Sequence, residues 1–449
     1  MENIKLKKKK HNRLFTIAIS FLALIFTGAL LLMLPFATKD GQTTTFLGAM
    51  FTSVSASCVT GLVVYDTFTH FTLFGQLVII TLIQIGGLGF ITFGVYGMML
   101  FRKKIGLENR ELIRDSLNTP SLASSISLVK SAVKGTIIIE LIGALILSTR
   151  FVGEFGFAKG VYYGFFHSIS AFCNAGFDLF GTFQPFSSLV PFANDKVVML
   201  TISALVIIGG IGFLVWEDVV NFGIRIKKYR FHSKLALAST AILLGVGTVL
   251  FLVSERSGVL SGMSTGDKLV NAFFAAITPR TAGFNSVDVA SMSGAGKLLT
   301  VILMFIGGSP GSTAGGIKTV TFAVLVLYIV SYIRRNKECT VFNRSITEDA
   351  VKKASTVFLI NLFLAVTATL AILCIQPFSF DDIFLETFSA MSTVGFSSGI
   401  TRSLLPASQI VIMLLMYFGR VGSLSFALLF TEKRKVANIK YPKEQIIIG

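Results

Sequence analysis

Charge is scarce in this chain of 449 residues, since only 14% of its residues are charged against ~25% in ordinary soluble domains. Together with a hydrophobic content of 53%, this scarcity excludes a soluble globular enzyme. Acidic residues are the scarcer sign, with 23 Asp and Glu against 40 Lys and Arg, so the formal net charge is +17. The placement of the basic residues must decide whether that charge indicates a nucleic-acid partner or a membrane topology.

Cysteine and histidine are also rare. The four Cys residues show no ligand spacing and the four His residues form no HExxH motif, which excludes a disulfide framework and gives no support for metal chemistry. The glycine-rich runs lie inside apolar stretches without a Gly-Lys-Ser or Gly-Lys-Thr sequence, so we expect no cofactor to be bound by this chain. A membrane-embedded enzyme would need a convergent set of His, Asp or Glu, and none is visible, so we expect no enzymatic activity.

Long apolar stretches, in contrast, are abundant. A helix needs ~20 largely apolar residues to cross the hydrocarbon core of a bilayer. Eight stretches meet or approach that length, at about 14–36, 72–101, 132–152, 197–223, 235–254, 298–333, 354–376 and 407–430. The sequence therefore predicts an all-α polytopic membrane protein with eight transmembrane helices and the lipid bilayer as a partner.

The basic residues concentrate on one side of this eight-span path. Of the 40 Lys and Arg residues, 29 lie in the N-terminal tail, in 102–134, 225–234 and 334–353, or in 433–443. By the positive-inside rule, both termini of this multi-pass protein are cytoplasmic. The charge of +17 is thus a topology signal, and we expect no nucleic-acid partner.

Four further apolar segments, 43–66, 160–181, 268–288 and 381–400, are too short and too rich in glycine to cross. Each contains, near its end, a tripeptide whose last residue is glycine: Val59-Thr60-Gly61, Asn174-Ala175-Gly176, Thr281-Ala282-Gly283 and Thr393-Val394-Gly395. These glycines are 115, 107 and 112 residues apart, and a second Gly-rich motif follows each of them in the next span. Such regularity indicates four tandem span–loop–span repeats, parallel to one another, with pseudo-fourfold symmetry about a central pore and one re-entrant pore loop each.

The predicted organisation follows from these boundaries. It comprises a cytoplasmic N-tail (1–13), repeat 1 (14–101), a cytoplasmic loop (102–134), repeat 2 (135–223), a loop (224–234), repeat 3 (235–333), a loop (334–353), repeat 4 (354–430) and a cytoplasmic C-tail (431–449).

The four tripeptides are candidates for an ion filter. Non-helical backbone at membrane depth is tolerated only where protein shields it or where it lines a watery path, and a ring of carbonyl oxygens can replace the hydration shell of an ion. Glycine suits such a ring because positive φ angles and close backbone approach carry no Cβ penalty. None of the tripeptides has an acidic side chain, which favours a monovalent cation over Ca²⁺. The predicted filter residues are Val59, Thr60, Gly61, Asn174, Ala175, Gly176, Thr281, Ala282, Gly283, Thr393, Val394 and Gly395.

Acidic residues follow three of the glycines, at Asp66, Asp178 and Asp288. They could raise the local cation concentration at the outer mouth. They could equally be solvated loop acids, and the sequence leaves both readings open.

The sixth stretch, 298–333, has 36 residues, nearly twice the ~20 that span a bilayer. Proline and five glycines interrupt its middle, so we expect a loop there at membrane depth, directly below the filter, that acts as a gate. The gate residues are Gly307, Gly308, Ser309, Pro310, Gly311, Ser312, Thr313, Ala314, Gly315, Gly316, Ile317 and Lys318. A tight glycine packing face is the alternative, and it is the expectation for the proline-free motifs 86–89 and 209–212, within continuous spans.

Arg420 occupies the position that Gly87, Gly210 and Gly308 fill in the other repeats. A guanidinium at membrane depth is costly, so it indicates a function or a fixed partner. We expect a barrier to cations in the pore, and keep as alternatives a salt bridge to Glu386 or hydrogen bonds to 307–318. Lys318 is expected to snorkel to the cytoplasm, with ion sensing or anchoring of the loop as the alternative.

The four Gly-centred pore loops and the Gly-rich second spans together resemble the Trk/Ktr/HKT superfamily of cation transporters over essentially the whole chain. Eight spans make the chain most similar to the KtrB-type membrane subunits of bacterial Ktr potassium uptake systems. The resemblance implies a potassium-conducting pore subunit in the bacterial cell membrane, with potassium at the filter. Sodium-preferring plant members have Ser at the first filter position, so Gly61 points to potassium. A sodium-selective uniporter of the same superfamily remains the alternative.

The resemblance also implies partners. The subunit would form a homodimer, each protomer with its own pore, on a cytosolic ring of nucleotide-binding KtrA-type subunits. ATP or ADP would act through that regulatory partner, K⁺ would be the substrate, and Na⁺ a possible activator that no residue of this sequence locates.

Overall fold

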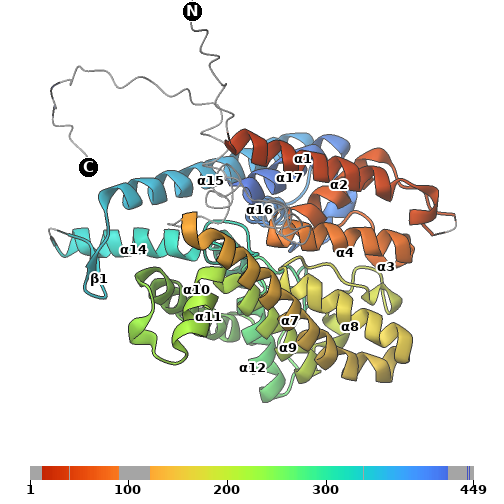
Figure 1. Ribbon diagram of the computed structural model, residues 1–449. Helices are drawn as coiled ribbons and strands as arrows, with labels where there is room; N and C mark the ends of the chain where they lie inside the picture. Colours follow the sequence, from red (N-terminus) through yellow and green to blue (C-terminus); the bar gives the residue numbers. More distant parts are fainter. Residues whose placement is uncertain are drawn as a thin grey trace, which may run out of the picture.

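The computed structural model describes residues 13–39, 41–89, 122–336 and 338–422, together with residues 442 and 444. Over these residues the chain is predominantly helical (Figure 1). The first two repeats contain α1 (Arg13–Leu32), α2 (Phe46–Ser57), α3 (Thr67–His70), α4 (Leu73–Leu88), α7 (Leu122–Phe155), α8 (Phe157–Phe172), α9 (Lys196–Ile211) and α10 (Phe213–Phe222). The last two contain α11 (Phe231–Ser254), α12 (Thr265–Ile277), α13 (Gly294–Phe305), α14 (Thr319–Ile333), α15 (Glu348–Ile375), α16 (Phe380–Ser392) and α17 (Pro406–Val421). A short antiparallel hairpin pairs β1 (Thr340–Val341) with β2 (Arg344–Ser345).

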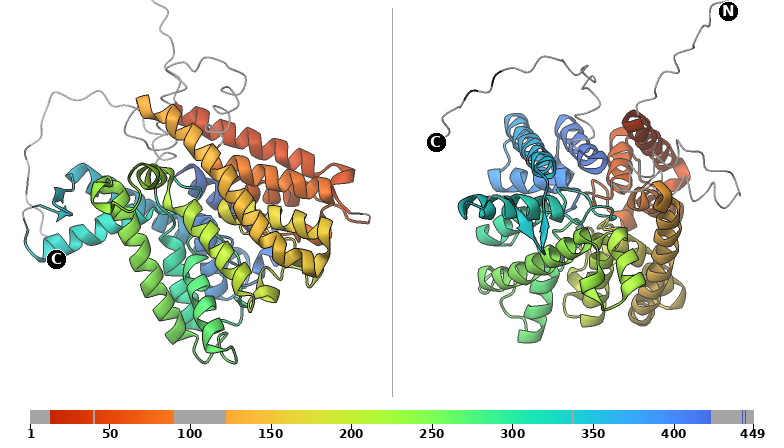
Figure 2. Two further views of the ribbon diagram at one scale, coloured as in Figure 1. Left: turned by 60° about the horizontal axis from the view of Figure 1, so that its bottom comes forward. Right: turned by 60° about the vertical axis from the view of Figure 1, so that its left-hand side comes forward.

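The four quarters of the chain surround a common centre, as the colour blocks in the right-hand view of Figure 2 show. Each quarter has a first helix, a shorter second helix and a third helix that follows the loop glycine. Neighbouring quarters meet through equivalent pairs, because α4 contacts α8, α9 contacts α12, α13 contacts α16, and α17 contacts α2. These contacts close a circle in which repeats 1 and 3 lie opposite each other, as do repeats 2 and 4.

Three of the four short second helices begin at side-chain caps. Thr45 accepts from the Gly48 N–H at the start of α2, Ser264 from the Asp267 N–H in α12, and Ser379 from the Asp382 N–H in α16. Such caps satisfy N–H groups that the first turn leaves unpaired. The starts of α2, α12 and α16 are therefore fixed at the ends that lie away from the loop glycines, whereas α8 begins after Gly156 without a side-chain cap.

Apolar side chains cover much of the outside of the molecule, for example Phe363 and Val253, which are 71% and 72% exposed. Among the described residues, Ile126–Phe155, Phe231–Ser254 and Glu348–Ile375 are long and apolar enough to cross a membrane, and α9 with α10 would be a fourth if the bent pair is one span. The helical, apolar character agrees with the prediction, whereas the number of eight spans stays a prediction.

The expectation of one continuous helix over 197–223 is wrong. The chain breaks at Gly212, whose φ is +103°, and α10 is bent by 98° from α9. The last carbonyls of α9 are taken by another part of the chain, because Ser309 N–H donates to Gly210 O and Thr313 N–H to Gly209 O. Tertiary hydrogen bonds thus replace the helical ones. The parts of the expected spans 72–101 and 407–430 beyond Gly89 and Gly422 lie outside the described residues.

Candidate functional site

The loop glycines Gly61, Gly176, Gly283 and Gly395 form a closed ring, called the glycine ring below. A Cβ built on any one of them would lie 3.0 to 3.2 Å from the Cα of the glycine in the next repeat. It would also meet the carbonyl oxygen of the residue that precedes that next glycine. These contacts run from repeat 1 to repeat 2, from 2 to 3, from 3 to 4 and from 4 back to 1. A side chain at any ring position would therefore push two loops apart.

The backbone has the same alternation in all four loops. The ring glycines have φ angles of +93°, +69°, +76° and +96°, and the residues two positions earlier, Val59, Asn174, Thr281 and Thr393, are also left-handed, at +57°, +61°, +77° and +52°. Such angles are uncommon for residues with a side chain, and β-branched residues tolerate them least. Four repeated outliers at one level of a structure indicate a functional constraint. The structure thus brings all twelve predicted filter residues together.

Backbone oxygens dominate this ring. The carbonyl oxygens of Thr60, Ala175, Ala282 and Val394 lie at the seams between adjacent loops, and no ring residue carries a carboxylate. The hydroxyls of Thr60 and Thr393 are buried without a hydrogen-bond partner. Carbonyl and hydroxyl oxygens without charge are suited to a weakly held cation such as an alkali-metal ion.

A hydroxyl side chain at the end of each short helix anchors the loop, a feature that was not among the expectations from the sequence. Ser55 and Ser389 accept from the N–H groups of Gly61 and Gly395, each at 3.1 Å. In the other two repeats the hydroxyl donates to the carbonyl just after the ring glycine, from Ser170 to Phe177 O and from Thr278 to Phe284 O, each at 2.7 Å. The signal was present in the sequence as Ser or Thr five or six residues before every ring glycine.

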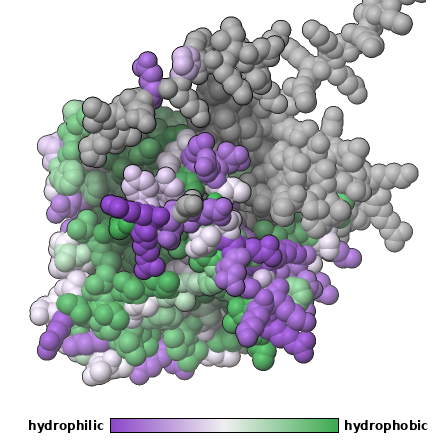
Figure 3. Space-filling view, turned by 90° about the vertical axis from the view of Figure 1, so that its left-hand side faces the viewer, coloured by the Kyte–Doolittle hydropathy of each residue, from purple (hydrophilic) through white to green (hydrophobic). Residues whose placement is uncertain are grey.

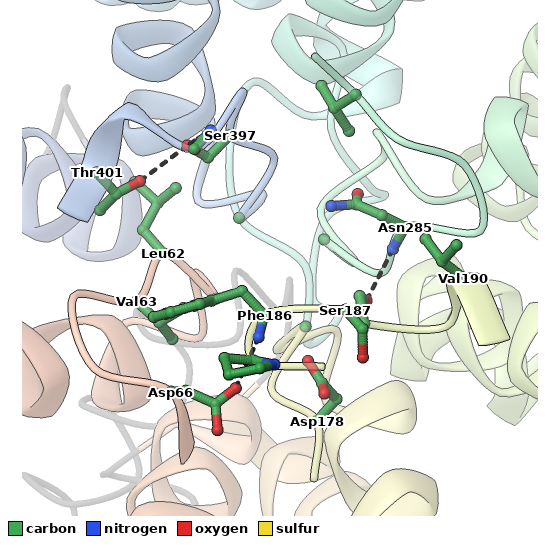
Figure 4. Close-up of a pocket in the computed structure, with 18 of the residues that line it drawn as sticks. Leu62, Val63, Asp66, Asp178, Phe186, Ser187, Val190, Asn285, Ser397 and Thr401 are labelled. Atoms are coloured by element: carbon green, nitrogen blue, oxygen red, sulfur yellow. Dashed lines mark hydrogen bonds between the residues drawn. The ribbon is translucent and has the colours of Figure 1, made fainter. Parts of the chain in front are cut away.

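One side of the ring opens into a cavity of about 610 Å³, called the vestibule below, which all four ring glycines help to line. Asp66, Asp178 and Asp288 line it as well. Asp66 is only 6% exposed and accepts from the Thr69 and Phe186 N–H groups at 2.7 and 2.9 Å, as Figure 4 shows for Phe186. Asp66 is thus held in place by hydrogen bonds, so the interpretation as a solvated loop acid is wrong for this residue.

One carboxyl group of the vestibule, that of Asp178, has a pKa above its ordinary value. Burial, followed by the nearby Asp66 charge, raises the pKa of Asp178 to about 7, against a smaller opposing effect of the Phe180 N–H that donates to it at 2.9 Å. The negative charge of the vestibule therefore changes near neutral pH.

A loop of repeat 2 lies across this vestibule. Phe186 has a φ of +63°, and the Arg402 guanidinium lies 4.3 Å from the centre of its ring, a cation–π contact. Leu189 N–H donates to Asn285 O at 2.9 Å. The loop therefore contacts repeat 1 through Asp66, repeat 3 through Asn285 and repeat 4 through Arg402, and sequence pattern gave no sign of it.

The other side of the ring faces residues 306–318, called the crossing segment, which lie between α13 and α14 and are non-helical as predicted. Thr313 Oγ1 donates to Phe172 O at 3.1 Å, and Phe213 N–H donates to Gly311 O at 2.8 Å. A Cβ on Gly315 would collide with the Thr393 side chain. The crossing segment of repeat 3 thus reaches under the ring to repeats 2 and 4.

Arg420 of repeat 4 contacts the crossing segment on the same side of the ring. Its guanidinium donates to Thr313 O at 2.5 Å, to Gly87 O at 2.9 Å and to Gly86 O. The hydrogen bond to the crossing segment agrees with one alternative, and the carbonyls of α4 are partners that the sequence did not indicate. The salt bridge to Glu386 is wrong, because Glu386 Oε1 instead accepts from Thr401 at 2.5 Å.

Lys318 is turned back onto the crossing segment. Its Nζ donates to Ala314 O at 2.6 Å and to Gly315 O at 3.3 Å. The expectation that Lys318 snorkels outward is therefore wrong, and the anchoring alternative fits the contacts. The reason is that helix α14 begins only at Thr319, which leaves loop carbonyls within reach of the ammonium group.

The glycine motifs 86–89 and 209–212 pack tightly, as expected, and Gly419 of repeat 4 packs in the same way. A Cβ on Gly86 would collide with Ser57 O, one on Gly209 with Phe172 O, and one on Gly419 with Met391 O. In each case the third helix of a repeat presses against the end of its own short helix. The packing supports the loop that carries the ring glycine.

The chain is similar to known cation transport proteins in both sequence and fold. The family model TrkH, described as cation transport protein, matches residues 2–439. The chain is 41% identical to the potassium/sodium uptake protein NtpJ of Enterococcus hirae, over 99% of both chains. It is 43% identical to the Ktr system potassium uptake protein B of Bacillus subtilis, over 96% of both chains. The crystal structure of the potassium transporter TrkH from Vibrio parahaemolyticus matches with a TM-score of 0.75 and 18% identity over 96% of this chain and 87% of that one, which shows a shared fold.

Proposed function

Because the chain belongs to the TrkH family of cation transport proteins, we propose that it is the potassium-conducting pore subunit of a potassium uptake system. The observation that carries this proposal is the closed glycine ring, in which four backbone loops meet with carbonyl oxygens at every seam. Transport requires no covalent chemistry, only a path in which protein oxygens replace water around the ion. The ring supplies such oxygens from each repeat.

In this proposal a K⁺ ion loses its hydration water at the ring. The filter consists of the three residues that end with each ring glycine, 59–61, 174–176, 281–283 and 393–395, and the carbonyl oxygens of these residues replace the lost water. The left-handed backbone of each loop holds the oxygens in place before the ion arrives, so the protein does not have to reorganise around it. Weak, uncharged ligands also let the ion leave again.

The vestibule is proposed to lie on the outer side of the membrane and to precede the ring on the ion path. Its three carboxylates would attract cations and exclude anions at low ionic strength. Asp66, which is tied to two backbone N–H groups, also organises the mouth. The vestibule is therefore proposed as the entry for hydrated ions.

The crossing segment and Arg420 are proposed as the gate, with residues 307–318 as its moving part. Support comes from their contacts: the segment lies under the ring, and Arg420 holds it to the carbonyls of α4. A guanidinium beneath the ring adds a positive charge on the ion path and opposes the passage of cations. Movement of the segment with its Arg420 contact would open the path.

The finer architecture belongs to the same proposal. It includes eight spans, four pore loops, the repeat boundaries given above and cytoplasmic termini in the cell membrane. The relative from Bacillus subtilis is named as a part of a Ktr system, so we include a homodimer on a nucleotide-binding KtrA-type ring, with ATP or ADP acting through the ring and Na⁺ as activator. The basic loops 225–234 and 334–353 are available to such a partner, and Figure 3 shows hydrophilic residues gathered among hydrophobic ones on the face where α14 and β1 lie.

The test is cation uptake by the purified protein in proteoliposomes. Potassium uptake should exceed sodium uptake under an inward gradient, and Gly61→Ser should reduce that ratio by about tenfold, since a Cβ at the ring strains the backbone by ~1–3 kcal/mol. Equal uptake of both ions by the unaltered protein would contradict the proposal of potassium selectivity. No uptake of either ion with or without the partner ring would contradict a pore.

A sodium-selective uniporter is the second candidate. It is favoured by the name of the relative from Enterococcus hirae, which includes both potassium and sodium. The same measurement separates the two candidates, because a sodium uniporter would transport Na⁺ faster than K⁺ before any substitution.

A further inference from the structure

One position on the short helices differs in chemistry between opposite repeats. It lies three residues before the hydroxyl that anchors each loop, one helical turn earlier on the same face. Repeats 1 and 3 have Thr52 and Ala275 there, whereas repeats 2 and 4 have His167 and Glu386. All four side chains are buried, and His167 and Glu386 have no exposed surface.

His167 holds the segment that follows Gly176. Its Nδ1 lies 2.8 Å from Tyr163 O, which can only accept, and Leu179 N–H donates to its Nε2 at 3.2 Å. The ring is therefore the neutral tautomer with the proton on Nδ1. Phe180 stacks on the same imidazole, with centroids 4.1 Å apart and an angle of 18° between planes. The His167 side chain thus contacts two consecutive residues beyond Gly176, Leu179 and Phe180.

Glu386 does the same in repeat 4. Its Oε1 accepts from Thr401 Oγ1 at 2.5 Å, and Thr401 Oγ1 lies 2.9 Å from Ser397 Oγ, a pair that Figure 4 shows at the edge of the vestibule. Ser397 is two residues beyond Gly395. The carboxylate therefore ties α16 to the segment that leaves the ring.

In the described parts of repeats 1 and 3, the residue at this position forms no such tie. Thr52 Oγ1 donates to Gly48 O within its own helix at 2.9 Å, and Ala275 has no polar side-chain atom. The segments held by His167 and Glu386 supply Asp178, Ser397 and Thr401 to the vestibule lining. The two ties are thus placed across the pore from each other.

We propose that His167 and Glu386 are positioning residues for ion selection, which hold the outer ends of two opposite loops and thereby the width of the glycine ring. This inference rests on the proposed function of the ring as a filter. Neither side chain contacts the ion. Each acts through the backbone that carries the ring glycine, so its loss loosens the ring without removing a ligand.

The experiment compares variants that keep or remove the tie. His167→Gln retains an acceptor near the Nε2 position, whereas His167→Phe keeps the aromatic stack and removes the acceptor. Glu386→Gln retains an oxygen for Thr401, whereas Glu386→Ala removes it. Thr401→Val breaks the second tie from its other end, and Thr52→Val is the matched control in repeat 1.

The measurements are the ratio of K⁺ to Na⁺ uptake in proteoliposomes and the unfolding temperature in detergent. His167→Phe, Glu386→Ala and Thr401→Val should lower the ratio by about fivefold, the equivalent of one hydrogen bond, while both Gln variants and Thr52→Val stay within about twofold. A purely structural role would lower the unfolding temperature and leave the ratio of the folded protein unchanged.

Gly61→Ser serves as the reference for the filter itself. An unchanged ratio in His167→Phe, Glu386→Ala and Thr401→Val overturns the inference when Gly61→Ser shifts the ratio. If Gly61→Ser also leaves the ratio unchanged, the filter assignment fails, and the inference with it. If Glu386→Ala does not fold, Thr401→Val decides for repeat 4, since it leaves the helix α16 intact.

Discussion

The glycine ring and the level beneath it are built from the same four repeats but differ in symmetry. At the ring every repeat contributes the same backbone, with the same pair of left-handed residues and the same contact to its neighbour. Beneath it the repeats diverge: α9 bends at Gly212, repeat 3 contributes the crossing segment, and repeat 4 contributes Arg420. The structure common to all four repeats, the ring, is thus made by backbone geometry. The features particular to one repeat are made by side chains and by loop length.

The comparison also shows what a single chain permits. In a tetramer of identical subunits a substitution beneath the ring would appear four times, and four guanidinium groups would crowd one axis. Here Arg420 occurs once, at the position where the other three repeats have glycine. It can therefore reach Gly86 and Gly87 of repeat 1 as well as Thr313 of repeat 3.

The largest effect should come from breaking the symmetric level. Gly283→Ser places a Cβ against Gly395 Cα and imposes a side chain on a φ of +76°, so K⁺ uptake should fall by about tenfold or more. Equivalent substitutions at the other ring glycines should be comparably harmful. Uptake in proteoliposomes measures this, with Gly294→Ser as the control, because a Cβ there meets nothing within 4 Å. A harmless Gly283→Ser would show that the ring does not carry the ions.

The next effect should come from the asymmetric level. Arg420→Gln removes a charged donor shared by Thr313 O and Gly87 O, and uptake should rise about fivefold because the crossing segment loses an anchor and the path loses a positive charge. Initial rates of K⁺ flux measure the change. The exposed Arg256, just beyond the end of α11, provides the matched control, Arg256→Gln, which should leave flux unchanged. Unaltered flux in Arg420→Gln would remove the barrier role.

A smaller effect should follow external pH. The vestibule holds Asp66, Asp178 and Asp288 with Arg402, and Asp178, with its pKa near 7, is neutral below that pH and charged above it. Uptake at low ionic strength should therefore fall by about threefold as external pH drops from 8 to 6. Asp178→Asn should flatten the profile and keep the rate low. If the pH profile is unchanged in this variant, a group other than Asp178 causes the pH dependence.

The smallest effect should come from Lys318→Met. This change removes two donors to Ala314 O and Gly315 O but leaves Arg420 in place, so flux should rise by about twofold. Comparing the double variant with Arg420→Gln alone tests whether the two cations restrain the same segment. Strictly additive effects would indicate independent anchors.

Features with regular spacing could be predicted from the sequence, and features made by long-range contacts could not. The tripeptides around Gly61 and its three equivalents predicted the residues that form the ring, because repetition of a special backbone leaves glycine at a fixed interval. Pro310 and its neighbouring glycines predicted the break between α13 and α14. Both signals are local.

The bend at Gly212 and the partners of Arg420 depend on distant segments. Gly212 lacks a neighbouring proline, and its helix breaks because residues of the crossing segment take the carbonyls of Gly209 and Gly210. Arg420 finds Gly86 from 334 residues away in the chain. The spacing of residues along the sequence does not indicate such long-range contacts. The anchoring hydroxyls were predictable in principle, since their offset from the ring glycines is nearly constant.

The closed ring has a consequence for how the protein is made. Gly61 rests against Gly176 on one side and Gly395 on the other, so the first loop cannot complete its contacts until the last repeat has left the ribosome. At ~5–20 residues per second, the wait between these two glycines is roughly 15 to 70 s. During that time three loops with open edges must be kept from lipid and from one another. The ring is therefore a late product of biogenesis, and chains truncated before repeat 4 should be targets for quality control in the membrane.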